Sequence, residues 1–206
     1  MDENLINIQE QLEKRCFYPV IWNFRFHPSW EPDIQFVYSC ATFEEVLQQS
    51  ESLRRDIQHY AINRWYNFWS QKALNEIFAS HPEVQAVNNS AKNLIRINGD
   101  VYQVKSLVYP NQFARTLRYA LQHEQEMVQW LCRKFSRNNH DHSEHQLFLL
   151  LFQRDGEHWK LKAKLTDLMA IVHEYLDNFN KNGMCQNQIS RENGCKCGLI
   201  WFINNE

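Results

Sequence analysis

The residues best suited to chemistry lie in a short segment near the middle of the chain, Asp100-Val101-Tyr102-Gln103-Val104-Lys105. Side chains alternate along a strand, so Gln103 and Lys105 are expected to point to the same face. A metal-dependent phosphodiesterase needs an oxygen ligand close to a lysine, because the oxygen binds the divalent ion and the ammonium group stabilises charge or orients the attacking water. Glu76, near the end of the preceding helical segment, could supply another oxygen ligand.

The elements around this segment indicate an α/β fold. Asn98-Gly99 is a strong signal for a two-residue hairpin, because both positions tolerate positive φ. Thr42-Phe43-Glu44-Glu45 has the pattern of a capping box, and His81-Pro82 ends the helical spacing that follows it. In chain order we expect a helix over 51–79, strands over 84–87, 93–97 and 101–108, a helix over 113–136, a strand over 147–152, a helix over 161–179 and a strand over 199–203. This order predicts a mixed central sheet flanked by helices.

This order of elements resembles the PD-(D/E)xK nuclease superfamily, whose members have the restriction-endonuclease-like fold. The resemblance runs from about Glu51 to about Ile203. The segments that carry it are AINRWYNFWSQKALNEIF, INGDVYQVKSLVYP, EMVQWLCRKF, LFLLLF and HWKLKAKL. The resemblance implies an αβββαβ core, DNA as the partner and, where the site is intact, a Mg²⁺-dependent endodeoxyribonuclease.

The resemblance also assigns roles to individual residues. It implies Glu76, Gln103 and Lys105 as the catalytic set, with Glu76, Asp100 and Gln103 as the metal ligands. The motif departs from the family pattern, because Gln103 stands where an Asp or Glu is usual and the strand before it offers only Asn93. A neutral amide is a poorer ligand for a hard cation than a carboxylate, so the site is expected to be degenerate.

Arginines are the expected contacts to the DNA backbone, although the basic residues are dispersed along the chain. We select Arg64, Arg115 and Arg118 as DNA-binding candidates.

Simpler interpretations stay open for each of these residues. Gln103 and Lys105 could be a solvated strand face. Glu76 lies four residues after Lys72, which is the spacing of an ordinary helix-surface pair. Asp100 follows a turn dipeptide and could be a turn residue. The predicted function is therefore a restriction-endonuclease-like protein that acts on or binds DNA with impaired phosphodiester hydrolysis, and the alternative is a catalytically inactive interaction subunit of a larger assembly.

Residues 1–43 are expected to form an aromatic N-terminal extension to a nuclease-like domain over 44–206. Prolines 19, 28 and 32 disfavour long helices there. Alternating rings suit an extended strand that covers the aromatic helix segment 65–69, with a protein partner or a homodimer as the other use. The alternating residues are Trp22, Phe24, Phe26 and Trp30.

Composition excludes several classes of protein. The chain of 206 residues has only 5 glycines, none in a GxGxxG or GxxxxGK[ST] cluster, which excludes Rossmann and P-loop nucleotide sites. A net charge of −2 gives no argument from bulk basicity. The acidic, polar N-terminus resembles no targeting peptide, and the apolar run 147–152 is too short to span a bilayer, so a cytoplasmic protein without a membrane partner is expected.

Cysteine and histidine clusters offer a further, weaker metal hypothesis. Cys185, Cys195 and Cys197 lack the second ligand pair of a usual zinc site, so structural zinc is not expected. The loop that carries His140 and His142 before His145 could bind a metal, but a solvated loop is the favoured interpretation.

Overall fold

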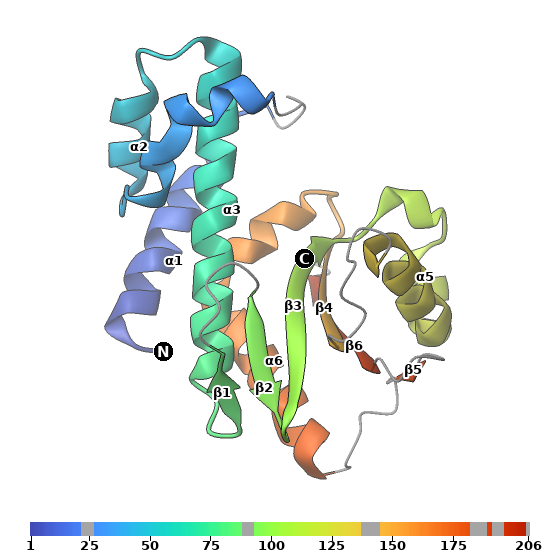
Figure 1. The fold of residues 1–206 in the computed structure, drawn as a ribbon. Helices are drawn as coiled ribbons and strands as arrows, with labels where there is room; N and C mark the ends of the chain where they lie inside the picture. The colour runs from blue at the N-terminus through green and yellow to red at the C-terminus, as the bar shows by residue number, and fades with distance from the viewer. Residues whose placement is uncertain (22–26, 88–92, 137–144, 182–188, 191–195, 205–206) are drawn as a thin grey trace. The chain divides into compact units, whose positions relative to one another are not determined.

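The computed structural model describes residues 1–21, 27–87, 93–136, 145–181, 189–190 and 196–204, which are drawn in colour in Figure 1. The chain forms two compact units, Met1–Leu74 with Lys162–Leu165 and Asn75–Leu161 with Thr166–Glu206. Both units include residues of the expected nuclease-like domain over 44–206, and that domain division stays a prediction. Among the described residues, no helix has the length and apolar run that a membrane crossing requires.

The first unit begins with the amphipathic helix α1 (Glu3–Cys16), which the sequence reasoning missed. Leu5, Ile8 and Leu12 follow helical spacing and are buried. The Asp2 side chain caps the helix, because its Oδ1 accepts a hydrogen bond from the Leu5 N–H at 2.8 Å. Both signals are visible in the sequence, so the helix was predictable.

The expected extended strand near the N-terminus is wrong at Trp30. This residue lies in the 3₁₀ helix η1 (Pro28–Trp30), which is followed by a second one, η2 (Pro32–Tyr38). Each begins with a proline, whose fixed φ suits a first helical position. The Trp30 ring packs on Tyr60, with centroids 5.6 Å apart. The other three rings of the expected alternation, Trp22, Phe24 and Phe26, lie outside the described residues.

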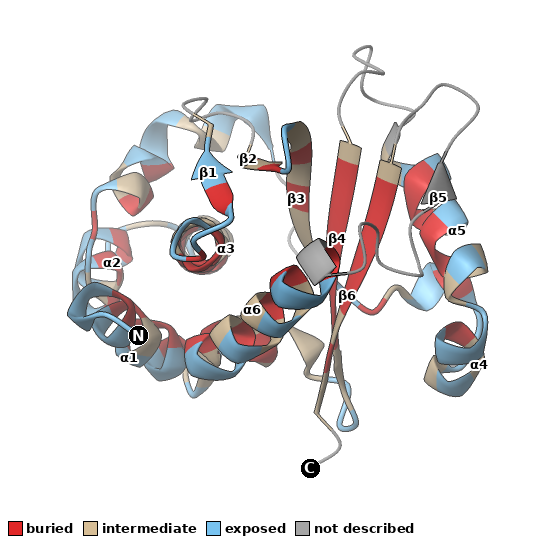
Figure 2. Ribbon diagram, turned by 90° about the horizontal axis from the view of Figure 1, so that it is seen from below, coloured by how far each residue is buried: buried red, intermediate tan, exposed pale blue. Residues whose placement is uncertain are grey.

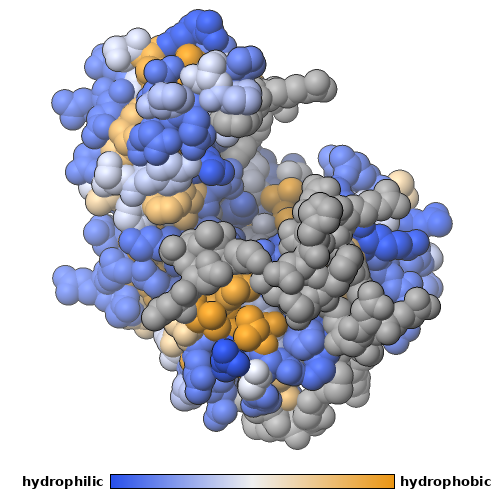
Figure 3. All heavy atoms as spheres, viewed as in Figure 1, coloured by the Kyte–Doolittle hydropathy of each residue, from blue (hydrophilic) through white to orange (hydrophobic). Residues whose placement is uncertain are grey.

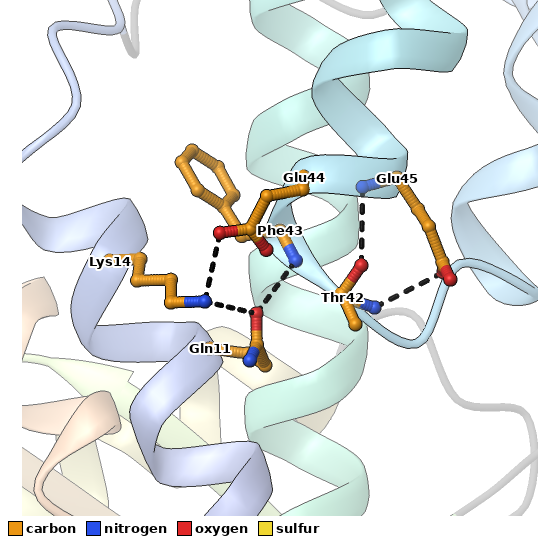
Figure 4. A network of polar contacts seen from close by, with 6 residues as sticks. All are labelled: Gln11, Lys14, Thr42, Phe43, Glu44 and Glu45. Carbon is orange, nitrogen blue, oxygen red and sulfur yellow. Dashed lines mark hydrogen bonds and ion pairs between the residues drawn. The ribbon is translucent and has the colours of Figure 1, made fainter.

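The predicted capping box is confirmed at the start of helix α2 (Phe43–Ser50). Thr42 Oγ1 accepts from the Glu45 N–H at 3.2 Å, and a Glu45 carboxylate oxygen accepts from the Thr42 N–H at 3.2 Å. Figure 4 shows how Gln11 of α1 joins this helix start, since its Oε1 accepts from the Phe43 N–H at 3.0 Å. These bonds satisfy N–H groups that have no partner within the helix and hold α1 against α2.

Helix α3 (Arg55–Ala79) begins after a short break from α2 and has no glycine or proline in its interior. Trp65 and Tyr66 are fully buried, so these rings belong to the core. The Trp65 indole N–H donates to the Cys40 carbonyl at 2.9 Å. The helix continues through Leu74 into the second unit, where His81-Pro82 follows its end as predicted.

The second unit contains a mixed sheet of six strands in the order β1-β2-β3-β4-β6-β5. The first three strands form an antiparallel meander, β4 runs parallel to β3, β6 runs parallel to β4, and β5 is antiparallel to β6. Asn98 and Gly99 have φ of 50° and 87°, as the predicted β2–β3 hairpin turn requires. The strands are β1 (Val84–Ala86), β2 (Leu94–Ile97), β3 (Asp100–Val108), β4 (His145–Gln153), β5 (Ile189–Ser190) and β6 (Lys196–Asn204).

Helices cover both faces of this sheet, as Figure 2 shows for the red, buried strands β4 and β6. Helix α5 (Glu124–Ser136) packs on one face, where Val128 and Leu131 join Phe148 and Leu150 in the core. Helix α6 (Leu165–Lys181) packs on the other face. The two helices that the sequence predicted as continuous each begin with a separate short piece. These pieces are α4 (Leu117–Gln122), after η3 (Asn111–Phe113), and η4 (His158–Ala163).

Candidate functional site

Gln103 and Lys105 share one face of β3, as their spacing predicts. Gln103 is in register with Gln146 of β4, and Lys105 is in register with Phe148. Phe148 belongs to the core beneath α5, so this is the sheet face that α5 covers. The Lys105 ammonium lies 5.3 Å from the centroid of the Phe135 ring, near the end of α5. The sheet therefore places an amide and a cation side by side on the α5 face.

The Gln103 amide oxygen is buried and accepts no hydrogen bond within the described part of the chain. A buried acceptor without a donor costs about 1–3 kcal/mol, so this oxygen is a strong acceptor for any N–H, O–H or cation that reaches it. Beside it on β2, the register places Leu94, an apolar side chain. The local donor set is thus one amide oxygen next to a leucine.

Asn93, the only polar residue that the sequence offered in place of the family's strand carboxylate, has a structural role. It adopts a left-handed backbone conformation with φ of 28°. Its side-chain oxygen accepts from the Asn75 amide at 2.9 Å, and its carbonyl accepts from the Val104 N–H at 3.0 Å. Asn93 therefore fixes the start of β2 against the end of α3 and the middle of β3.

Asp100 lies on the opposite face of β3 from Gln103. Its carboxylate forms an ion pair with Lys196 of β6 and lies 3.7 Å from Nε2 of His145, the first residue of β4. The hydrogen bond from Lys196 lowers the pKa of the Asp100 carboxyl, and the charge of Lys196 and His145 adds to this effect. The Lys196 backbone N–H donates to His145 Nδ1 at 3.0 Å. Three neighbouring strands are therefore joined at their amino ends by polar contacts.

Glu76 lies half-buried in the last turns of α3. Around it, the Ile77 carbonyl contacts Nε2 of His173 at 3.3 Å, and the Ser80 hydroxyl lies 3.0 Å from the same nitrogen. His173 belongs to α6, so this end of α3 packs on α6, the helix of the face opposite to Gln103. The structure brings Gln103 together with Lys105 and separates Asp100 from them.

The three candidate arginines belong to different units. Arg64 is exposed in the first unit, where its Nε donates to the Tyr38 hydroxyl at 3.1 Å. Arg115 and Arg118 are exposed in the second unit, and the Arg115 guanidinium lies 5.1 Å from the centroid of the Tyr119 ring. Of the three candidates, Arg115 and Arg118 therefore share a unit, and Arg64 belongs to the other.

Of the residues in the cysteine and histidine metal hypotheses, Cys197 and His145 are among those that the structure describes. Cys185, Cys195, His140 and His142 lie outside the described residues. Cys197 is fully buried in the core under α5. Within the described ranges, no group of three His, Cys, Asp or Glu side chains is placed to hold a metal ion.

Sequence reasoning missed two groupings in the second unit. One is the contact of His145 and Lys196 with Asp100, which depends on the register of parallel strands that are far apart in the sequence. The other is a pocket of about 320 Å³ between residues 107–112 and the end of α5. Polar residues at the carboxyl end of a strand, such as Asn111 and Gln112, were its only signal.

Comparisons of the chain with protein-family models, with curated proteins and with solved structures found no match.

Proposed function

We propose that this chain is a restriction-endonuclease-like protein that binds DNA and whose metal-dependent hydrolysis is impaired. The observation that carries the proposal is the topology around Gln103 and Lys105. A helix end, the antiparallel strands β1, β2 and β3, a crossing helix and the parallel strand β4 follow one another in the αβββαβ order. The strand that bears the lysine is the second strand of the β2–β3 hairpin, as the family resemblance implies.

The impairment of metal-dependent hydrolysis follows from the few oxygen ligands on the sheet face that α5 covers. A Mg²⁺ ion needs near-octahedral oxygen ligands, commonly with one or two carboxylates. The Gln103 amide faces Leu94 on one side, and Asp100 is directed to the other face and paired with Lys196. The residues at this position do not fit a Mg²⁺ site.

DNA binding is supported by the cations that remain on the same face. Arg96 is in register with Val101, which places it on the face of Gln103 and Lys105. Figure 3 shows apolar atoms at the surface over β2 and β3 with hydrophilic atoms beside them. Leu94 and Val101 are only half-buried on this face. A surface of cations around a partly apolar floor suits a backbone phosphate and the sugar or base next to it.

The test is binding and cleavage measured together. Fluorescence anisotropy with a labelled DNA strand and its duplex, in EDTA over a range of salt concentrations, should show salt-dependent binding. Lys105→Ala should weaken it, whereas Lys72→Ala, an exposed lysine of the first unit, should not. Neither Mg²⁺ nor Mn²⁺ should induce cleavage on a gel. Absence of binding at low salt overturns the proposal, and Mg²⁺-dependent cleavage that Lys105→Ala abolishes overturns the impairment.

A second candidate function is that of an interaction subunit, and one observation supports it. Phe17, at the end of α1 in the first unit, is 87% exposed, and Ile21 nearby is 47% exposed. Self-association through these side chains would bury them. Sedimentation velocity over a hundredfold range of concentration tests this candidate. A dimer that Phe17→Ser dissociates supports it, and a monomer throughout removes the homodimer.

A further inference from the structure

The pocket beside Lys105 has the size and lining of a site for one small flat group. Its volume of about 320 Å³ is at the lower end of the roughly 300–1,000 Å³ that ligand pockets span. Leu107, Pro110 and Leu131 supply apolar walls, and Leu107 lies on the same face of β3 as Lys105. The pocket lies wholly within the second unit, on the α5 side of β3.

Amide groups stand at the rim of this pocket. Asn111 and Gln112 line it and are exposed. Each side-chain amide offers both a donor and an acceptor, which suits a ligand whose edge carries both kinds of group. The Gln112 oxygen accepts a hydrogen bond from the Lys134 ammonium, so the rim also holds a cation in place.

Two lysines place positive charge around one aromatic ring of the pocket. The ammonium groups of Lys105 and Lys134 lie 5.3 Å and 5.9 Å from the centroid of Phe135. Lys134 is also 4.8 Å from the centroid of Trp130. Ring faces attract cations at such distances, so the two charges are held near the pocket. The charge complement of this arrangement is an anion next to an apolar, flat group.

We propose that the pocket holds the base of an unpaired nucleotide in a bound DNA strand, with Lys105 and Lys134 at the phosphates that flank it. This inference rests on the proposed DNA-binding function and specifies its ligand. A base has apolar faces for the walls, a polar edge for Asn111 and Gln112, and charged phosphates on its backbone. A base inside a duplex is stacked and paired, so only an unpaired one can enter.

The first experiment compares three labelled probes on the unaltered protein by fluorescence anisotropy. They are a single DNA strand, the same strand with abasic sites at its central positions, and the duplex. The abasic strand keeps every phosphate and loses only the bases. We expect the complete single strand to bind at least about fivefold more tightly than the abasic strand, which is the lower end of the effect of one stacked base. The duplex should bind more weakly than the complete strand.

Two substitutions then locate the effect. Asn111→Trp fills the pocket from its exposed rim and should reduce the affinity for the complete strand to that for the abasic strand. Lys134→Ala should lower the slope of log affinity against log salt by about 0.7, the contribution of one contact to a single-strand phosphate. Lys72→Ala is the matched control, because Lys72 likewise lies over an aromatic ring, Trp69, at 4.4 Å, but belongs to the first unit.

The outcomes separate this inference from the function beneath it. If all three probes bind equally and Asn111→Trp changes nothing, the base pocket is wrong while DNA binding stands. If no probe binds at low salt, the DNA-binding proposal itself fails. Circular dichroism of each variant verifies folding, and the abasic comparison needs no variant at all.

Discussion

At the scale of single residues, the polar groups on the two faces of β3 differ in how well the sequence predicts their neighbours. Gln103 and Lys105 were predictable as neighbours because strand alternation is a local rule. The partners of Asp100 were not predictable, because His145 and Lys196 reach it only through the register of β4 and β6. No local pattern in a sequence determines how two distant strands align, and the nearest local interpretation of Asp100 was a turn residue.

The ion pair of Asp100 leads to a prediction about pH. A carboxyl with a lowered pKa stabilises the fold above its unfolded pKa, near 4, and loses this contribution as pH falls through the folded value. Since Asp100 is 37% exposed, solvent screens the pair and we expect Asp100→Asn to cost about 0.5–1 kcal/mol at pH 7. Urea denaturation at pH 7 and pH 2.5 measures it. The difference from the unaltered protein should be smaller at pH 2.5 than at pH 7, and an equal difference at both values contradicts the assignment.

Lys162, in the first unit, is a strongly perturbed lysine. Burial lowers the pKa of Lys162 to about 8, and its ammonium donates to the Asn67 side-chain oxygen at 2.9 Å. The unfolded chain holds this proton up to about pH 10.5, so stability must rise between pH 8 and that value. Lys162→Met should therefore stabilise the protein at pH 7 by on the order of 2 kcal/mol.

The measurement is guanidinium denaturation of both proteins at pH 7 and at pH 9.5. The advantage of Lys162→Met should shrink at the higher pH, because the unaltered protein then folds with a neutral amine. An equal advantage at both values would show that packing, not charge, is responsible. Lys162→Gln, which keeps a donor for Asn67, separates the loss of the hydrogen bond from the loss of the charge.

At the scale of elements, helices and strands were predictable wherever one periodicity continued without interruption. The capping box at Thr42, the hairpin at Asn98-Gly99 and the apolar strand β4 all follow local rules. The break at His123 was missed because the apolar spacing continues across it. Helix α1 was missed because its buried apolar residues, Leu5, Ile8 and Leu12, are few and lie within a mostly polar segment. The pocket at the end of β3 arises from contacts between β3 and α5, which no single element reveals.

The packing of α6 on the sheet depends on a glycine. A Cβ at Gly198 would lie 2.5 Å from the Tyr175 hydroxyl and 2.8 Å from Cδ1 of Leu147. Gly198→Ala should therefore cost about 1–3 kcal/mol, as other overpacked cores do. In a Tyr175→Phe background the hydroxyl is absent, so the same change should cost about 1 kcal/mol less. Denaturant midpoints of the four proteins complete the cycle, and strict additivity would refute the contact.

At the scale of the whole molecule, a single helix belongs to both compact units. Helix α3 runs from Arg55 to Ala79, and the division between the units falls within it, after Leu74. Because a helix propagates cooperatively, loss of order in one unit should fray the part of α3 that serves the other. We expect the unaltered protein to lose its helical signal in one thermal transition.

Lys72→Pro tests this coupling. Proline at the exposed position 72 removes one helical hydrogen bond and clashes with the preceding turn, at a cost of about 3 kcal/mol. Thermal melts followed by circular dichroism should then resolve two transitions, whereas Lys72→Ala should keep one. Two transitions in the unaltered protein would show that the shared helix does not couple the units.

The buried thiols beneath α5 offer a way to measure how often this part of the structure opens locally. Cys132 and Cys197 are 3% and 0% exposed, and both lie where this helix meets the sheet. A thiol reagent reaches a sulfur in such a place only when the surrounding structure opens locally. The rate at which these two side chains are modified, read peptide by peptide in a mass spectrometer, therefore reports how often α5 lifts from the sheet, without any attached probe.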